Sequence, residues 1–162
     1  MSPLRVAVLT ISDAGARGER ADASGDAIAA WAAARGDDVV QRTLVPDEAD
    51  RIGAVLSRWA DDDAADLVLT TGGTGLTPRD VTPEATKAVL EKEAPGIAEA
   101  LRFAVYPRFP RAALSRGIAG VRKRTLVVNL PGSPGGVRDG LAILAEIVDH
   151  AVELVRGERT TH

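Results

Sequence analysis

Long apolar runs recur along the chain, and their composition predicts β-strands. The runs are rich in valine, isoleucine and leucine. Residues 39–45 are expected to form one strand. The runs at residues 5–11, 67–71 and 125–129 lack the regular polar alternation of a strand with one solvent-exposed face, so we expect these strands to be buried on both faces. Strands of this kind need a layer of helices on each side.

Segments with helical spacing lie between these runs. Apolar residues three and four positions apart, or continuous alanine, predict helices at residues 25–34, 46–59, 82–93, 95–105 and 141–155. Ser24 is the expected N-cap of the first helix, and Gly36 is expected to end it. Segment 106–116, which contains two prolines, is expected to be irregular. Strands that alternate with helices predict an α/β fold, in which a mostly parallel sheet carries helices on both faces.

The length and composition indicate one globular domain with an aliphatic core. The 162 residues fit a single domain at residues 1–157, followed by a flexible tail at residues 158–162. Aromatic residues make up 3% of the chain, so alanine, valine, leucine and isoleucine must fill the core. Cysteine is absent, which excludes disulfides, thiol catalysis and cysteine-bound zinc, and fits a reducing compartment.

Charge and hydropathy argue against nucleic acid and membranes as partners. The net charge is -3, and the longest apolar run, residues 27–34, is far too short to cross a bilayer. The N-terminus lacks the layout of a signal peptide, so we expect a cytoplasmic protein. Basic residues are nevertheless concentrated in segment 102–124, which contains no acidic residue. Either a solvated surface or a site for an anionic ligand explains that segment.

A glycine-rich turn after the third predicted strand is the most informative motif. Residues 70–75 read TTGGTG, a polar loop with Asp80 near its end follows, and a helix is expected from Thr82. Backbone N–H groups beside a helix N-terminus suit a phosphate or another anion, and Asp80 can offer a carboxylate to a metal. Pro78 stands where the dinucleotide fingerprint needs glycine, and no P-loop lysine motif occurs. The alternative is an ordinary turn, but the concentration of glycine, threonine and aspartate favours an anion site.

Polar residues also follow the other strands. In a parallel sheet the carboxyl ends of the strands share one edge, so segments 10–13, 71–80 and 129–133 are expected to converge there, together with Asp47. Each residue has a structural alternative. Asp47 and Asp80 could cap the helices that follow them, and Asn129 could fasten its own loop.

These residue types suit the transfer of a phosphorus group. Such a reaction needs N–H donors and cations around the phosphate oxygens, and Mg²⁺ is normally held by one or two carboxylates plus phosphate oxygens. Asp47 and Asp80 supply the carboxylates, and residues 72–75 supply the donors. Ser115, Asn129 and Ser133 could fix a polar ligand by hydrogen bonds.

Other chemistries fit less well. His150 lies within the last predicted helix and His162 is terminal, so a serine–histidine–aspartate triad has no obvious base. Two histidines without cysteine also leave zinc poorly served. Cleavage of a sugar by paired carboxylates stays open, although it leaves the glycine-rich turn unexplained.

The motifs together resemble the MogA/MoaB family of molybdenum-cofactor biosynthesis proteins. The resemblance rests on TTGGTGLTPRDVTPEAT at residues 70–86, LTISD at 9–13, VPDE at 45–48 and LSRGIAGVRKRTLVVNLPGSP at 114–134. It covers nearly the whole chain, and GGTG, PRDVTPE and NLPG in this order are highly specific. The resemblance implies the α/β fold of that family, assembly as a homotrimer and the metal-inserting enzyme of the same pathway as a partner.

The activity implied by the resemblance is adenylyl transfer. Molybdopterin and ATP, with Mg²⁺, would give adenylyl-molybdopterin and pyrophosphate. By position in the motifs, Asp80 is the essential carboxylate and Asp47 its partner at the metal. The remaining residues implied by the motifs are a nucleotide and phosphate cradle at Gly72, Gly73, Thr74 and Gly75, a pterin pocket at Ser115, Asn129, Pro131 and Gly132, and further lining of the same cleft by Ser12 and Asp13.

The sequence departs from some members of the family that perform the transfer. Those members have extra residues between NLPG and the final helix, and this chain runs straight from Ser133 to Leu141. The shorter layout occurs both in the MoaB branch and in the active plant-type domain, and the retained Asp47 and Asp80 favour activity. A protein that binds or holds molybdopterin without chemistry is the main alternative. A regulator that binds only ATP through the glycine cradle is a third possibility.

Overall fold

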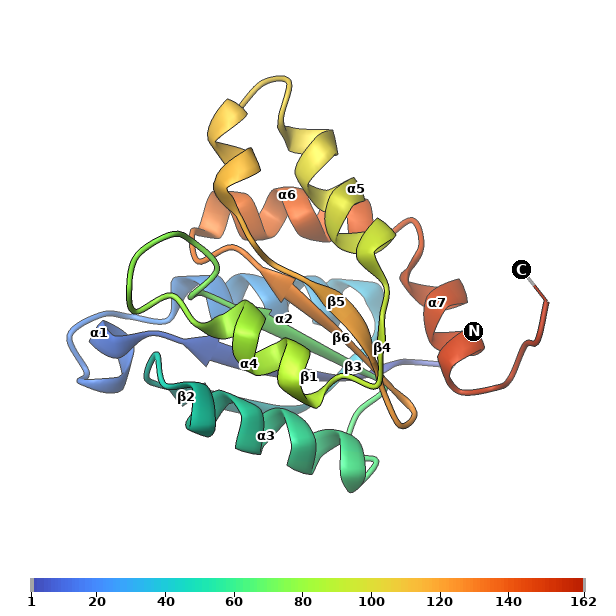
Figure 1. Ribbon diagram of the computed structural model, residues 1–162. Coiled ribbons are helices and arrows are strands. Elements are labelled where there is room, and N and C mark those ends of the chain that lie inside the picture. Colours follow the sequence, from blue (N-terminus) through green and yellow to red (C-terminus); the bar gives the residue numbers. More distant parts are fainter. Residues whose placement is uncertain (1, 162) are drawn as a thin grey trace.

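A six-stranded sheet forms the centre of the protein in the computed structural model, which describes residues 2–161. The strands are β1 (Arg5–Ile11), β2 (Asp38–Val45), β3 (Leu67–Thr71), β4 (Lys92–Glu93), β5 (Ala119–Arg122) and β6 (Thr125–Leu130). Their order in the sheet is β2-β1-β3-β6-β5-β4 (Figure 1). Strands β2, β1, β3 and β6 run parallel, whereas β5 is antiparallel to both of its neighbours, β6 and β4. The predicted α/β class is confirmed.

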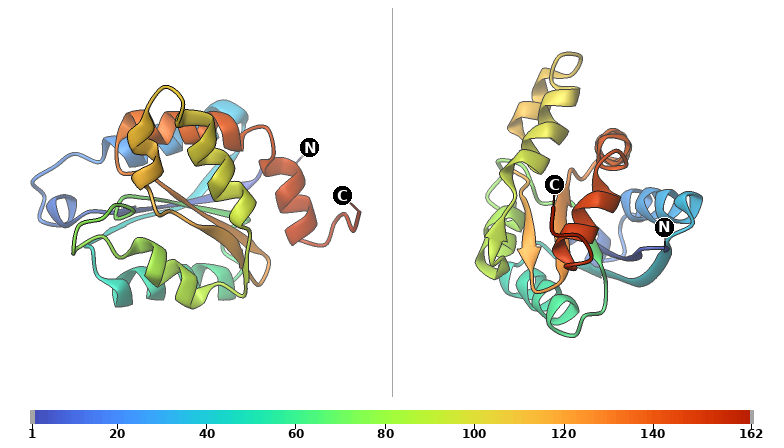
Figure 2. Two further views of the ribbon diagram at one scale, coloured as in Figure 1. Left: turned by 45° about the horizontal axis from the view of Figure 1, so that its top comes forward. Right: turned by 90° about the vertical axis from the view of Figure 1, so that its right-hand side faces the viewer.

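Helices cover both faces of the sheet. They are α1 (Asp13–Ala16), α2 (Ala23–Arg35), α3 (Ala49–Asp61), α4 (Thr82–Val89), α5 (Pro95–Val105), the 3₁₀ helix η1 (Pro110–Leu114), α6 (Pro134–Leu144) and α7 (Val148–Val155). Helices α3 and α4 lie on one face, and α2, α6 and α7 lie on the other (Figure 2). Among residues 2–161, no helix is long and apolar enough to cross a membrane.

Side chains of the central strands alternate between two hydrophobic cores. Val6 and Val8 of β1 pack with α2 and α6 on one side, and Ala7 and Leu9 pack with α3 on the other. All four are fully buried. Because both faces of each central strand are covered, the strands carry almost no polar residue until they reach their ends.

Two predicted elements differ at the antiparallel side of the sheet. The helix predicted for residues 82–93 ends at Val89, because Lys92 and Glu93 pair with β5 as a two-residue edge strand. Strand β5 itself was not predicted. Gly120 lies so close to the backbone of Lys92 that any Cβ there would collide with its carbonyl oxygen. This close pairing, rather than local hydrophobicity, sets the β4–β5 edge.

The long helix predicted at residues 141–155 is wrong, because two helices occupy that region. Helix α6 begins earlier, at Pro134, where the Ser133 hydroxyl accepts a hydrogen bond from the Gly136 N–H at 3.1 Å. The chain then turns, and α7 begins at Val148. The turn brings Val148 and Val152 into the core beside β6.

The start of α2 also differs from the prediction. Its N-cap is Asp22, whose carboxylate accepts a hydrogen bond from the Gly25 N–H at 3.0 Å. The predicted cap, Ser24, instead donates its hydroxyl to the carbonyl oxygen of Gly132 at 2.6 Å. Gly36 ends the helix in the left-handed conformation, with φ of 83°, as predicted. The segment 106–116, predicted to be irregular, contains η1.

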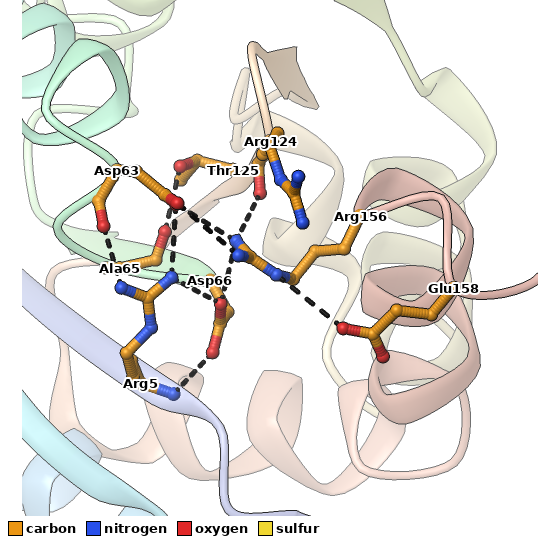
Figure 3. A network of polar contacts seen from close by, with 8 residues as sticks. All are labelled: Arg5, Asp63, Ala65, Asp66, Arg124, Thr125, Arg156 and Glu158. Carbon is orange, nitrogen blue, oxygen red and sulfur yellow. Dashed lines mark hydrogen bonds and ion pairs between the residues drawn. The ribbon is translucent and has the colours of Figure 1, made fainter.

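An ion-pair network joins the amino ends of the central strands (Figure 3). Asp66, just before β3, accepts hydrogen bonds from the backbone and the guanidinium of Arg5, both at 2.8 Å. Arg156, which follows α7, pairs with Asp66 at 2.9 Å and with Asp63 at 3.0 Å. The network therefore fastens the C-terminal helix to the amino ends of the strands, away from their carboxyl ends.

Replacing Arg156 should destabilise the fold. Arg156→Gln leaves Asp66 with one cation and removes the tie to α7, so we expect the free energy of unfolding to fall by about 1–3 kcal/mol at pH 7. Arg159 is the matched control, since it is an exposed arginine that pairs with Glu153 at 3.2 Å. Arg159→Gln should cost about 0.5 kcal/mol or less. Urea unfolding monitored by circular dichroism measures both changes, and equal costs would contradict the account.

The same network predicts how the effect depends on pH. The hydrogen bond from Arg156 lowers the pKa of Asp63 to about 2. Burial acts to raise the pKa of Asp66, but hydrogen bonds from Arg5 outweigh it and the pKa is lowered. The unfolded chain binds these protons near pH 4. The stabilisation is therefore complete above about pH 4 and is lost as the pH falls toward about 2, where Arg156→Gln and the unaltered protein should converge in stability.

Candidate functional site

A cavity of about 600 Å³ opens where the parallel strands end. Its lining from the exits of β1, β3 and β6 comprises Thr10, Ile11, Ser12, Thr71, Gly72, Gly73, Asp80, Gly132 and Ser133. Asp47, which follows β2, lines it as well. Figure 1 shows α1 and the loop between β3 and α4 at the same end of the sheet. The predicted convergence of the polar strand exits is confirmed, and we call this space the first cavity.

Asp47 is fixed by a reciprocal pair of hydrogen bonds with Asp13. The Asp13 N–H donates to Oδ2 of Asp47 at 2.9 Å, and the Asp47 N–H donates to Oδ1 of Asp13 at 3.0 Å. Asp47 does not cap the following helix, whose N-cap is Glu48. Its Oδ1 faces Gly73, where a Cβ would come within 3.0 Å. Asp13 itself does not line the cavity but is bonded to Asp47, which does.

The pKa values of the two aspartates of this pair are shifted in opposite directions. Burial raises the pKa of Asp47, and the nearby charges of Asp13 and Asp80 raise it further, against the hydrogen bond from Asp13. Hydrogen bonds from Arg79 and from the Asp47 backbone lower the pKa of Asp13 to about 2. A cation beside Asp47 and Asp80 would relieve the repulsion between them.

Asp80 shapes its own loop. Its Oδ2 accepts hydrogen bonds from the backbone N–H and the hydroxyl of Thr77, at 3.0 and 2.9 Å. It does not cap α4, whose N-cap is Val81. Among residues 2–161, no hydrogen bond reaches Oδ1 of Asp80 or Oδ1 of Asp47. Each carboxylate therefore has one oxygen held in place and one available to a ligand.

The glycine turn needs its glycines for backbone geometry. Gly72 and Gly73 have φ of 102° and 67°, a region that side chains disfavour, and a Cβ on Gly72 would collide with the Ile11 carbonyl. The Thr82 hydroxyl donates to the Gly72 carbonyl at 2.9 Å. The Gly72 N–H is engaged by the Leu130 carbonyl at 3.3 Å, whereas the Gly73 N–H has no partner among the described residues. Gly73 is thus a residue of the turn that both lines the cavity and has an available N–H donor.

The other two residues of the predicted cradle lie outside the cavity lining. The carbonyl oxygens of Thr74 and Gly75 accept hydrogen bonds from the backbone and the guanidinium of Arg116, at 2.8 and 2.7 Å. Gly75 lies beside Asp80, and a Cβ there would come within 2.8 Å of its Oδ2. These residues shape the loop that carries Asp80.

A second cavity of about 560 Å³ adjoins the first. It lies between α5, η1 and α6, and its lining includes Ser115, Asn129, Pro131, Arg102, Arg108 and Arg111. Ser133 lines both cavities, so the turn after β6 forms the wall between them. The residues predicted for a pterin pocket are therefore divided, with Gly132 in the first cavity and the other three in the second.

Asn129 is mainly held within the protein. Its amide donates to the hydroxyls of Thr70 and Thr86, at 2.9 and 3.1 Å, and its Oδ1 accepts from the Ile118 N–H at 3.1 Å. The residue is 4% exposed. These bonds support the alternative that Asn129 has a structural role in holding its own loop and the neighbouring elements. Asn129 also lines the second cavity.

The basic segment 102–124 divides into two groups. Arg116 pairs with Glu84, and Arg122 pairs with Asp61 at 2.9 Å, so both brace the fold. Arg108 and Arg111 lie at the second cavity, where Arg108 pairs with Asp139 at 3.0 Å. Part of the segment therefore has a structural role, and Arg108 and Arg111 are positioned where an anionic ligand could be tested.

Sequence reasoning missed several residues of the first cavity. Arg20 and Asp22 line it from the connection between α1 and α2. Asp22 also accepts the Thr10 hydroxyl at 2.9 Å and pairs with Arg42 at 3.0 Å. The position of Asp22 before the helix could have identified it as a cap, but no local pattern marks Arg20.

The site also limits how a metal could bind. Among residues 2–161, no three histidine, cysteine, aspartate or glutamate side chains are grouped as metal ligands. Asp47 and Asp80 each offer a carboxylate oxygen at the cavity that has no partner in the part of the chain that the structure describes. This donor set fits Mg²⁺, which commonly takes one or two carboxylates and completes its shell with substrate phosphates and water.

Comparison with known proteins gives consistent results. The profile of the family described as "Probable molybdopterin binding domain" matches residues 7–150. A molybdopterin adenylyltransferase from Helicobacter pylori (strain J99) is 38% identical, with 97% of this chain and 90% of that protein covered. A molybdenum cofactor synthesis protein of Drosophila melanogaster, cinnamon, is also 38% identical, and this chain spans 28% of its length.

Solved structures agree with the sequence matches. The molybdopterin biosynthesis enzyme MoaB from Thermus thermophilus superposes with a TM-score of 0.90 at 51% identity, covering 95% of this chain and 97% of that one. The Mog protein from Mycobacterium ulcerans gives a TM-score of 0.89 at 41% identity, with 97% and 99% covered. The chain therefore belongs to the MogA/MoaB family of molybdenum-cofactor biosynthesis proteins.

Proposed function

We propose that this protein is a molybdopterin adenylyltransferase, which uses Mg²⁺ and ATP to form adenylyl-molybdopterin and pyrophosphate. The observation that carries the proposal is the pair Asp47 and Asp80. Both line the first cavity, and each has an oxygen without a partner among the described residues. Gly73, whose N–H also has no partner among those residues, lines the same cavity. The names of the relatives from Helicobacter pylori and Escherichia coli support it.

The reaction forms one phosphorus–oxygen bond and breaks another. An oxygen of the terminal phosphate of molybdopterin attacks the α-phosphorus of ATP, and the bond to the oxygen that bridges the α- and β-phosphates breaks. Pyrophosphate leaves with that electron pair. The protein contributes alignment and charge rather than a covalent intermediate.

The residues of the first cavity divide these tasks. Asp47 and Asp80 would hold Mg²⁺, which when bound supplies positive charge to the phosphate oxygens. The Gly73 N–H donates to the same phosphates. Arg20 adds a cationic side chain at the cavity. Backbone donors held by the fold need no rearrangement as charge builds up on the phosphorus group.

The two cavities suggest where each substrate lies. We place the triphosphate in the first cavity and the pterin in the second, beside Ser115, Asn129 and Pro131. Their shared wall at Ser133 is where the two phosphates would meet. Arginines at the second cavity favour the anionic pterin phosphate.

The second candidate is a protein that binds molybdopterin without chemistry. It is motivated by the direct entry of the chain into α6 at Pro134, with no inserted segment after Gly132. It retains the second cavity but needs no role for Asp47 and Asp80. Pyrophosphate release distinguishes the two candidates.

Purified protein, mixed with molybdopterin and Mg-ATP, should release pyrophosphate in proportion to the adenylyl-molybdopterin formed. A coupled colorimetric assay measures the release, and chelation of the metal should stop it. Binding of molybdopterin can be measured separately by fluorescence quenching. If the protein binds molybdopterin in that assay but releases no pyrophosphate, the binding-only candidate is established instead.

Asp80→Asn should lower turnover by at least about 100-fold, because it removes a negative charge that acts on the metal-bound transition state. The amide oxygen can still accept from Thr77, so we expect the fold and pterin binding to persist. Asp62→Asn, an exposed aspartate after α3, is the control and should leave turnover unchanged. Steady-state rates at saturating substrates test this, and full activity of the Asp80 variant would refute the role.

We further propose a homotrimer that passes its product to the metal-inserting enzyme of the pathway. Phe103, Tyr106, Phe109 and Leu114 are large apolar residues that stay exposed on α5, η1 and their connection, which favours an interface there. Light scattering should give three times the chain mass of 16.9 kDa. A monomer at micromolar concentration would overturn this assembly.

A further inference from the structure

Arg79 connects the loop that carries Asp80 to Asp13, the hydrogen-bond partner of Asp47. It immediately precedes Asp80, and its guanidinium donates through Nε and Nη2 to the two carboxylate oxygens of Asp13, both at 2.9 Å. Asp13 begins α1, directly after the exit of β1. This two-point contact therefore spans from the β3–α4 loop to the β1 exit.

Asp13 continues the connection to Asp47. Its backbone N–H and its carboxylate each form one bond of the reciprocal pair with Asp47, at 2.9 and 3.0 Å. The chain of contacts thus runs from the residue beside Asp80, through Asp13, to Asp47. Neither Arg79 nor Asp13 lines the cavity, so both would act on it only through other residues.

The remaining contacts of the loop point elsewhere. Thr77 bonds to Asp80 within the loop, and Arg116 holds the carbonyl oxygen of Asp80 at 2.9 Å from the β5 side. Among residues 2–161, the Arg79–Asp13 contact is the only side-chain hydrogen bond that links residues 74–80 to Asp13 or Asp47. Through this contact, the position of the loop that carries Asp80 is coupled to that of Asp47.

We propose that Arg79 and Asp13 are positioning residues that fix Asp47 and Asp80 at the spacing needed for one divalent cation on a triphosphate. An exposed ion pair adds little to stability, and the Arg79 side chain is 60% exposed. A planar guanidinium that donates to both oxygens of a carboxylate does, however, fix direction and distance. The identity of the nucleotide rests on the proposed function, but the cation site does not.

Arg17 provides a matched control for Arg79. It is equally exposed, at 60%, pairs with Glu19 at 3.0 Å and lies near enough to Asp13 to lower its pKa by charge alone. Arg17→Gln removes the same charge near the same acidic group without breaking the two-point contact. The comparison therefore separates positioning from a general loss of positive charge.

The test measures binding of Mn²⁺, alone and with ATP, by electron paramagnetic resonance. Arg79→Gln should weaken Mn²⁺ binding in the presence of ATP by ~10-fold or more, as loss of groups that orient metal ligands commonly does. Arg17→Gln should change it by less than ~2-fold. Asp13→Asn should match Arg79→Gln, and the double variant should lose little more, because the two act as one unit. Melting temperatures of the single variants should stay within about 3 °C of the unaltered protein.

Three results would overturn the inference. They are unchanged Mn²⁺–ATP affinity in Arg79→Gln, an equal loss in Arg17→Gln, and no Mn²⁺–ATP binding by the unaltered protein. Pyrophosphate release gives a separate readout, in which Arg79→Gln should raise the Mg²⁺ concentration for half-maximal rate more than it lowers the maximal rate. If the unaltered protein released no pyrophosphate but the Mn²⁺ results held, the proposed function would fail and this inference would stand.

Discussion

The site is built around the close passage of the chain at Gly72 past the carbonyl oxygen of Ile11. Only a residue without a side chain fits there, and its backbone adopts a left-handed conformation. Because β3 leaves the sheet this close to β1, the loop that follows can reach Asp13 and Asp47. Gly72, Gly73 and Asp80 line the cavity, so this turn and its loop form one wall of it.

The polar groups of the protein gather at the two ends of the central strands. Both faces of the central strands are covered, so hydrogen-bonding side chains gather where the strands begin or end. At the amino ends they pair with one another, as Arg5, Asp66 and Arg156 do. At the carboxyl ends Asp47 and Asp80 each keep an oxygen free of partners among the described residues. The polar groups at the amino ends stabilise the fold, and those at the carboxyl ends are available to a ligand.

The central strands were predictable from the sequence because hydrophobicity alone determines them. Strand β1 spans the predicted residues, and so does β3. The edge strand at Lys92 and Glu93 was not predictable, because two polar residues become a strand only through pairing with β5. The break between α6 and α7 likewise has no marker such as glycine or proline at residues 145–147.

The candidate site was predictable as a set of strand exits but not as a set of contacts. Topology alone brought Asp47 and Asp80 to one edge. The choice between Ser24 and Asp22 as a helix cap depended on which side chain faced the helix, which sequence spacing does not encode. The contact between Asp13 and Asp47 joins residues 34 positions apart, so no local pattern could reveal it.

The proposed reaction requires one divalent cation between Asp47 and Asp80 when a triphosphate is bound. Crystals grown with Mn²⁺ and a non-hydrolysable ATP analogue would show this ion, because anomalous scattering locates it without assumptions about the ligand. We expect an anomalous peak in contact with Oδ1 of both aspartates and with phosphate oxygens of the analogue. An ion bound to the phosphates but touching neither aspartate, or only one of them, would rule out a shared cation site.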